Sequence, residues 1–212
     1  MTKNLDLSLY LVTDSTYHTE ESLLYTVEEA CKGGVTLVQL REKNTGGRDY
    51  LEKACKIKKI TDRYQVPLII DDRADVAMAC GAAGVHVGAS DLPVAEVRRL
   101  LGPDKIVGAT AKTVEAAKKA YEDGADYLGV GAVFHTDSKA DAADISHETL
   151  KAITEAVDIP VIAIGGISKE NVSELSGTGI CGIAVISAIF AEKDIKNATK
   201  KLKKLTEEMV EA

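Results

Sequence analysis

The chain contains no tryptophan and two phenylalanines in 212 residues, and aromatic residues make up 4% of it while apolar residues make up 45%. A core therefore has to be built from Ile, Val, Leu and Ala, which is typical of a parallel sheet covered by helices. No apolar run reaches the 18 or so residues that a membrane-spanning helix needs. The N-terminal MTKNLDLSLYLVTD also lacks a basic segment followed by a long apolar one. We therefore expect a cytoplasmic protein without a membrane contact.

Paired cysteine motifs are absent as well. The four cysteines, Cys31, Cys55, Cys80 and Cys181, show no CxxC or metal-ligand spacing and lie in apolar or helical stretches. This predicts buried free thiols in a reducing compartment.

Positive charge is scarce relative to negative charge. There are 33 acidic and 26 basic residues, for a net charge of −7. This balance argues against non-specific binding to nucleic acid or to an anionic membrane. A phosphorylated small molecule remains a suitable partner, provided that basic side chains gather locally around it.

Short β-branched runs alternate with amphipathic segments along the whole sequence. Eight units of this kind favour a closed (β/α)8 TIM barrel, a single domain over residues 1–212, rather than an open doubly wound sheet. The strands are expected near 9–14, 36–40, 67–71, 84–87, 105–110, 127–133, 160–165 and 182–187. Helices are expected at 22–34, 49–64, 74–80, 92–102, 113–125, 148–157 and from 194 onward.

Carboxylates end two neighbouring predicted strands. Asp71 and Asp72 close one apolar run, and the next β/α unit delivers Asp91. Because the carboxyl ends of parallel strands meet at one mouth of a barrel, these acids are expected to lie together and to hold a hard divalent cation. The alternative is that they cap helix N-termini.

The segment QLREK, residues 39–43, ends the second predicted strand. Arg41 and Lys43 are alternate residues, so both side chains can point to the same side. An Arg fork beside a Lys point charge suits a diphosphate. Solvated strand-end charges are the alternative.

Two glycines and a serine follow the last two strands. Gly165 and Gly166 let backbone N–H groups approach a ligand, and Ser187 stands where a helix would begin after strand eight. Barrels of this kind commonly bind phosphate there. The alternative is a pair of tight turns.

For three further residues, a functional role and a purely structural role are both possible. Lys139, in the polar loop 134–144, can stabilise a departing anion or form a Schiff base, or can be merely solvated. Thr110 can offer its hydroxyl to a ligand or cap a helix. For His86, between two valines on a short strand, a packed or supporting role is favoured over a ligand role. Neither a Ser–His–Asp nor a Cys–His arrangement can be argued from spacing.

In order along the chain, the segments QLREK, IDDRAD, GVHVGASD, GAT, GAVFHTDSK, AIGGI and VISAI resemble the motifs of the thiamine-phosphate synthase family. The resemblance covers nearly the whole chain. Four positions depart from the family pattern: Asp71 stands where Asn is usual, Ala89 replaces Gln, Thr110 replaces Ser and His135 replaces Pro.

The resemblance implies a (β/α)8 transferase that joins hydroxymethylpyrimidine diphosphate to hydroxyethylthiazole phosphate and releases pyrophosphate and thiamine phosphate. It implies Mg²⁺ on Asp72 and Asp91, and two phosphorylated small molecules as partners. A homo-oligomer is possible. The residues implied on the pyrimidine side are Gln39, Arg41, Glu42, Lys43, Asp71, Thr110 and Lys139. Those implied on the thiazole side are Thr136, Asp137, Ser138, Gly166, Ile186 and Ser187. Within these sets, Arg41, Thr110 and Lys139 are expected to act in the reaction itself.

Such a reaction needs no protein nucleophile. Pyrophosphate loss leaves positive charge on an electron-rich pyrimidine, and the neutral thiazole nitrogen attacks it, so the missing triad is what this chemistry predicts. Three other functions stay open: a thiazole tautomerase-like relative, a barrel that binds thiamine precursors without turnover, and an aldolase with a Schiff base on Lys139. A requirement for Mg²⁺ separates the synthase from the tautomerase.

Overall fold

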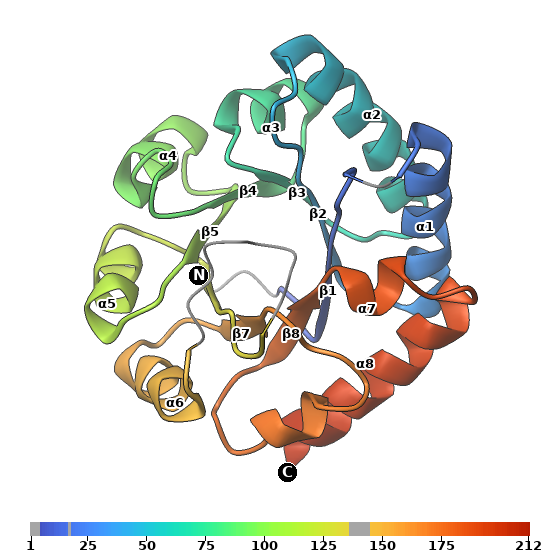
Figure 1. Cartoon of the computed structure of the whole chain (residues 1–212). Coiled ribbons are helices and arrows are strands. Elements are labelled where there is room, and N and C mark those ends of the chain that lie inside the picture. The colour runs from blue at the N-terminus through green and yellow to red at the C-terminus, as the bar shows by residue number, and fades with distance from the viewer. Residues whose placement is uncertain (1–4, 17, 136–144) are drawn as a thin grey trace.

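Eight parallel strands close into a barrel in the computed structural model, which describes residues 5–16, 18–135 and 145–212. Each strand pairs with the next along the chain, and β8 returns to pair with β1 (Figure 1). The strands are β1 (Leu9–Val12), β2 (Leu37–Leu40), β3 (Leu68–Asp71), β4 (Gly84–Val87), β5 (Ile106–Thr110), β6 (Tyr127–Val130), β7 (Val161–Ile164) and β8 (Gly182–Val185). The closed (β/α)8 barrel predicted from the sequence is confirmed.

Helices surround the barrel on the outside (Figure 1). They are α1 (Glu20–Gly33), α2 (Gly47–Arg63), α3 (Ala74–Cys80), α4 (Val94–Leu101), α5 (Val114–Glu122), α6 (His147–Ala156), α7 (Ser187–Phe190) and α8 (Ile195–Glu211). Between β7 and β8 the described chain forms only a 3-10 turn, η1 (Val172–Leu175), where the fold usually has a full helix. α8 packs against both α1 and η1 and so covers this part of the barrel, with Leu202 and Met209 buried.

The apolar core has two layers because strand side chains alternate in direction. Leu9 and Leu11 point outward against the helices, whereas Tyr10 and Val12 point into the barrel. The expectation of an almost purely aliphatic core is wrong in one respect. Three tyrosines, Tyr10, Tyr50 and Tyr127, are among the largest fully buried side chains. Their burial is tolerated because each hydroxyl is hydrogen-bonded.

The thiol prediction is partly wrong. All four cysteines are free, but only Cys31 is buried, Cys80 and Cys181 are half-buried and Cys55 is exposed. On α2 the buried face contains Tyr50, Ala54 and Ile57. Cys55 lies beside that face because successive residues are about 100° apart around a helix. Burial raises the pKa of the Cys31 thiol to about 12.

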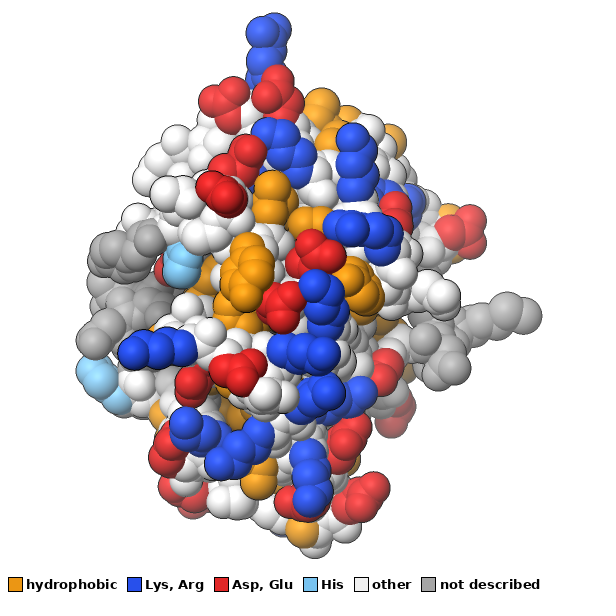
Figure 2. Space-filling view, turned by 90° about the vertical axis from the view of Figure 1, so that its right-hand side faces the viewer, with side chains coloured by type: hydrophobic (Ala, Val, Ile, Leu, Met, Phe, Trp, Pro, Cys, Tyr) orange, Lys and Arg blue, Asp and Glu red, His pale blue; other side chains and the backbone are white. Residues whose placement is uncertain are grey.

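Charged side chains of both signs are interspersed on the face of the barrel that Figure 2 shows, with small apolar areas between them. Several form pairs one helical turn apart, for example Lys203 with Glu207 on α8. None of the helices in the described part of the chain combines the length and apolarity that a membrane crossing requires.

Candidate active site

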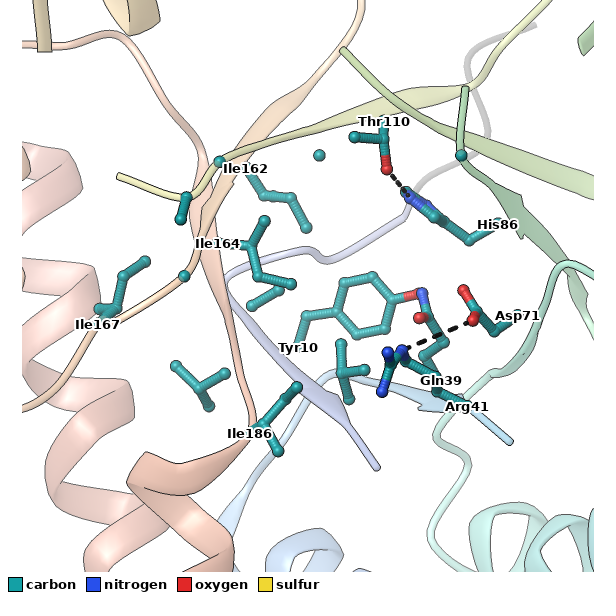
Figure 3. Close-up of a pocket in the computed structure, with 18 of the residues that line it drawn as sticks. Tyr10, Gln39, Arg41, Asp71, His86, Thr110, Ile162, Ile164, Ile167 and Ile186 are labelled. Atoms are coloured by element: carbon teal, nitrogen blue, oxygen red, sulfur yellow. Dashed lines mark hydrogen bonds and ion pairs between the residues drawn. The ribbon is translucent and has the colours of Figure 1, made fainter. Parts of the chain in front are cut away.

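A cavity of about 540 Å³ opens at the carboxyl ends of the strands. Its walls come from all eight strands and the loops after them, because inward-pointing residues at each strand end share this mouth. Figure 3 shows polar and charged side chains on the wall formed by β2, β3, β4 and β5, facing isoleucines from β7 and the loop after β8. The cavity therefore has one charged wall and one apolar wall.

Arg41 and Lys43 both line the cavity, as their alternate spacing predicts. Leu37 and Gln39 of β2 point into the barrel, and Arg41 continues that inward series. The backbone N–H of Arg41 donates to the hydroxyl of Thr13 (3.0 Å), which ties the end of β2 to β1. Arg41 Nε is buried and makes no hydrogen bond within the described residues. It forms a long ion pair with Oδ2 of Asp71, 3.9 Å away (Figure 3), so this buried donor still has a hydrogen bond to give to a bound anion.

Three carboxylates gather around Lys43. Its Nζ lies 3.1 Å from Oδ2 of Asp71 and contacts Asp72 as well. Asp72 is paired in turn with Asp91, whose Oδ2 accepts a hydrogen bond from the backbone N–H of Gly88 (2.8 Å). The alternative that these acids cap helices is wrong: the N-caps of α3 and α4 are Arg73 and Pro93.

The three acids differ in their electrostatics. Burial, with the charge of Asp72 beside it, raises the pKa of Asp71. Burial and Asp72 also raise the pKa of Asp91. Burial alone would raise the pKa of Asp72, but hydrogen bonds with Lys43 and Asp91 hold it below its ordinary value. Crowded carboxylates that repel one another are the pattern expected of a cation site.

The carboxylates of the cavity could supply part of the ligand set of a Mg²⁺ ion. Within the described part of the chain, no group of three or more His, Cys, Asp or Glu side chains has the arrangement of a closed metal centre. Asp72 and Asp91 offer two carboxylates at the cavity wall. Mg²⁺ is commonly held by one or two carboxylates together with waters and substrate phosphates, so these residues fit that ion.

The floor of the cavity is polar. Gln39 Nε2 donates to the hydroxyl of Tyr10 (2.7 Å), and Tyr10 bonds Tyr127 (2.9 Å). His86 bonds Tyr127 through Nδ1 and Thr110 through Nε2, both at 3.0 Å. His86 is thus packed in a polar network, as favoured from the sequence. Thr110 lines the cavity and is not a helix cap, because Thr113 caps α5.

Sequence reasoning missed Tyr10 and Tyr127. The available signal was a tyrosine at an inward position of an otherwise aliphatic strand, in LYLV and in YLGV. The pKa of both hydroxyls is raised by burial.

Gly165 and Gly166 lie on the opposite side of the cavity mouth, with Ile186 and Ser187. Both glycines have positive φ, 101° and 67°. A Cβ on Gly166 would lie 2.5 Å from the backbone oxygen of His135, so the loops after β6 and β7 pack too closely for a side chain. The glycines therefore serve as a tight turn and as cavity wall at once. Ser187 begins α7, which is only four residues long.

Not all implied residues reach the cavity. Glu42 points away from it: its side chain is 4% exposed and pairs with Lys53 (2.8 Å), with Ser15 as a second partner. The residues Thr136, Asp137, Ser138 and Lys139 lie outside the described residues. The structure brings together the others, which are Gln39, Arg41, Lys43, Asp71, Asp72, Asp91, Thr110, Gly166, Ile186 and Ser187.

Comparison with known proteins identifies the family of the chain. The thiamine monophosphate synthase family matches residues 9–189. The chain belongs to that family. It is 54% identical over 200 residues to the thiamine-phosphate synthase of Clostridium tetani, covering 94% of this chain and 96% of the relative. It is 51% identical to that of Methanobrevibacter smithii, covering 95% and 96%.

Solved structures of the family have the same fold. The thiamine phosphate pyrophosphorylase from Pyrococcus furiosus superposes with a TM-score of 0.89 at 41% identity, covering 97% of this chain and 98% of that one. The membership expected from the sequence motifs is confirmed. The chain is therefore an enzyme of a transferase family, and its charged cavity is the candidate active site.

Proposed function

We propose that this family member condenses 4-amino-2-methyl-5-hydroxymethylpyrimidine diphosphate with 4-methyl-5-(2-hydroxyethyl)thiazole phosphate, giving thiamine phosphate and pyrophosphate. The observation that carries the proposal is the convergence of Arg41 and Lys43 with the Asp72–Asp91 pair on one wall of a single cavity. Gly166 and Ser187 on the other side offer a second place for a phosphate. The diphosphate of one substrate would bind at the charged wall, and the phosphate of the other would bind beside Gly166 and Ser187.

The leaving group would be bound by the charged wall. Arg41 and Lys43 face the place where negative charge grows as the C–O bond to the diphosphate breaks. Arg41 Nε makes no hydrogen bond among the described residues, so binding an anion would compete only with its long ion pair to Asp71, at 3.9 Å. Asp72 and Asp91 would hold Mg²⁺, which when bound supplies positive charge toward the diphosphate. We propose that Lys139 adds a further positive charge from the loop after β6.

The steps after pyrophosphate loss require few protein groups. The aminopyrimidine itself can carry the positive charge that remains after pyrophosphate loss, and the thiazole nitrogen attacks as a neutral nucleophile. No general base is required for that attack. The apolar wall of Ile162, Ile164 and Ile186 would keep water away from the pyrimidine cation. Water that reached the cation would attack it and convert it to the alcohol.

We also propose a cytoplasmic location, which the four free thiols support.

The decisive experiment measures pyrophosphate release by the purified protein with both precursors, each precursor alone, and both without Mg²⁺. Release that requires both precursors and the metal is expected. No release from protein that still binds the thiazole phosphate would leave the tautomerase-like or the non-catalytic binding function. Turnover that persists in EDTA would remove the metal from the proposal.

A further inference from the structure

Five side chains form an unbroken series of hydrogen bonds across the floor of the barrel, and only its two ends are among the residues that the family resemblance implies. The series runs from Gln39 through Tyr10, Tyr127 and His86 to Thr110. Figure 3 shows its members other than Tyr127, with the bond between His86 and Thr110 dashed. These residues come from β2, β1, β6, β4 and β5, so the series crosses the barrel rather than following one strand. Gln39 and Thr110 both line the cavity.

The space for this series is built into the strands. A Cβ on Gly108 of β5 would lie 2.2 Å from the Tyr127 ring, so the ring occupies room that only glycine leaves free. Gly129 of β6 faces the His86 ring in the same way, with 3.3 Å between an added Cβ and Cε1. Tyr10 and Tyr127 also meet edge to face, with their ring centroids 6.0 Å apart. The rings are therefore fixed in position by the backbone on either side.

The donors along the series set its direction. An amide nitrogen can only donate, so the Tyr10 oxygen accepts from Gln39. The single proton of Tyr10 then goes to Tyr127, its other hydrogen-bond partner within the described residues. The proton of Tyr127 goes in turn to Nδ1 of His86. A neutral imidazole that accepts at Nδ1 carries its proton on Nε2, which donates to Thr110.

This direction leaves the proton of the Thr110 hydroxyl unused within the series. Because Thr110 lines the cavity, that proton is available to an acceptor atom of a bound ligand. Burial keeps both tyrosines protonated, since it raises the pKa of each hydroxyl above its ordinary value. Hydrogen bonds in such a buried series reinforce one another and resist reversal.

We propose that Tyr127 and His86 are positioning residues that fix the Thr110 hydroxyl as a hydrogen-bond donor toward the substrate. The acceptor is an atom of the bound substrate, and naming it a ring nitrogen of the aminopyrimidine rests on the function proposed above. The direction of the series rests on the hydrogen-bond geometry, on a neutral His86 ring and on pairing each hydroxyl proton with an acceptor within the series. Held in this way, the ring keeps one orientation relative to Arg41 and the metal-binding acids while its diphosphate leaves.

The first test uses no substrate. The ¹⁵N chemical shifts of the His86 ring, assigned by the signals that disappear in His86→Gln, report its tautomer in the free enzyme. The Nε2–H tautomer is expected. Tyr127→Phe removes the donor to Nδ1 and should give a tautomer mixture, whereas Tyr10→Phe leaves that donor in place and should not. A wild-type Nδ1–H tautomer, or no change in Tyr127→Phe, would overturn the proposal.

The second test separates positioning from a purely structural role. Tyr127→Phe and Thr110→Val should each raise the KM for the pyrimidine diphosphate about tenfold, as loss of one buried hydrogen bond does, and leave the KM for the thiazole phosphate unchanged. The double variant should resemble the single ones, because both changes break one series. Tyr64→Phe, whose hydroxyl bonds Glu28 outside the barrel, is the matched control and should behave as wild type.

A Tyr127→Phe enzyme with a lowered Tm and unchanged KM values would show that the series only holds the barrel together, and would overturn the proposal. If Tyr127→Phe does not fold, Thr110→Val and the wild-type tautomer still decide. Wild-type enzyme without pyrophosphate release would defeat the proposed function, while the tautomer measurement would still test the direction of the series.

Discussion

The Nζ atom of Lys43 lies 3.1 Å from Oδ2 of Asp71, and the same ammonium group contacts Asp72. A lysine from the end of β2 thus lies between carboxylates from the end of β3, on the wall where a divalent cation and a diphosphate would bind. In the proposed function, Lys43 would partly neutralise the acids in the free enzyme and turn to the diphosphate when a metal takes its place. This arrangement leads to predictions about each group around it.

Asp91→Asn should lower Mg²⁺-dependent turnover by on the order of a hundredfold or more, because the amide supplies no negative charge to the metal. The fold should be kept, since the amide oxygen can still accept from the N–H of Gly88. Turnover across a Mg²⁺ titration is the measurement. Asp104→Asn, an exposed acid in the loop before β5, is the control. Full activity in Asp91→Asn would remove this residue from the metal site.

Arg41→Lys should lower kcat/KM for the pyrimidine diphosphate by roughly a hundredfold, although the charge is kept. A lysine cannot form the two-pronged contact of a guanidinium with a diphosphate, and it removes the buried Nε, which makes no hydrogen bond among the described residues and lies 3.9 Å from Oδ2 of Asp71. Steady-state kinetics with each substrate varied in turn checks this. An equal loss for both substrates would point to damage of the whole cavity.

Asp71→Asn should stabilise the protein at neutral pH. The folded state holds the pKa of Asp71 above its usual value, through burial and the charge of Asp72, so the folded state binds the proton more tightly than the unfolded state does. The contribution of this group to stability is therefore largest at low pH and is lost as pH rises through the raised pKa. The amide cannot ionise, so the difference in Tm between variant and wild type should grow from pH 4 to pH 7. A constant difference would contradict the assignment.

The same Asp71→Asn variant should bind the pyrimidine diphosphate more tightly, because one negative charge near the leaving group is gone. A fall in KM of a few-fold is expected, the scale of a screened charge–charge interaction. An increase would mean that the carboxylate itself contacts the substrate.

Gly166→Ala should raise the KM for the thiazole phosphate tenfold or more and leave the KM for the pyrimidine diphosphate nearly unchanged. The added methyl would collide with the backbone oxygens of Phe134 and His135 and displace the loop after β7. Gly177→Ala is the matched control: its φ of 73° carries the same backbone strain, but no atom lies within 4 Å of the added Cβ. Equal effects in the two variants would attribute the loss to strain alone.

The positions of the strands follow from local sequence. Each apolar run between turn signals is too short for a helix, and eight such runs alternating with amphipathic helices have one economical closed arrangement. The exception is the segment between β7 and β8, where the polar, glycine-containing stretch supports only a 3-10 turn. α8 packs against this turn as well as against α1, and no local pattern indicates that contact.

The residues of the charged wall could also be predicted from the sequence. Strand-end residues of a parallel barrel share one mouth, so the sequence alone places Arg41, Lys43, Asp72 and Asp91 together. Glu42 shows the limit of that reasoning. It lies between two cavity residues in QLREK, yet strand alternation turns it outward to Lys53.

The sequence by itself determined the barrel, the family and the charged residues of the cavity, because periodicity and motif order are local properties of the chain. Only the tertiary structure decided which polar atoms meet across the barrel floor. Tyr10 and Tyr127 are 117 residues apart, and their hydroxyls come within 2.9 Å only because β1 and β6 project side chains into the same closed interior. A hydrogen bond forms only when the donor–acceptor distance is correct to within a few tenths of an ångström. Strand packing and the room left by Gly108 determine that distance, and no spacing along the chain encodes it.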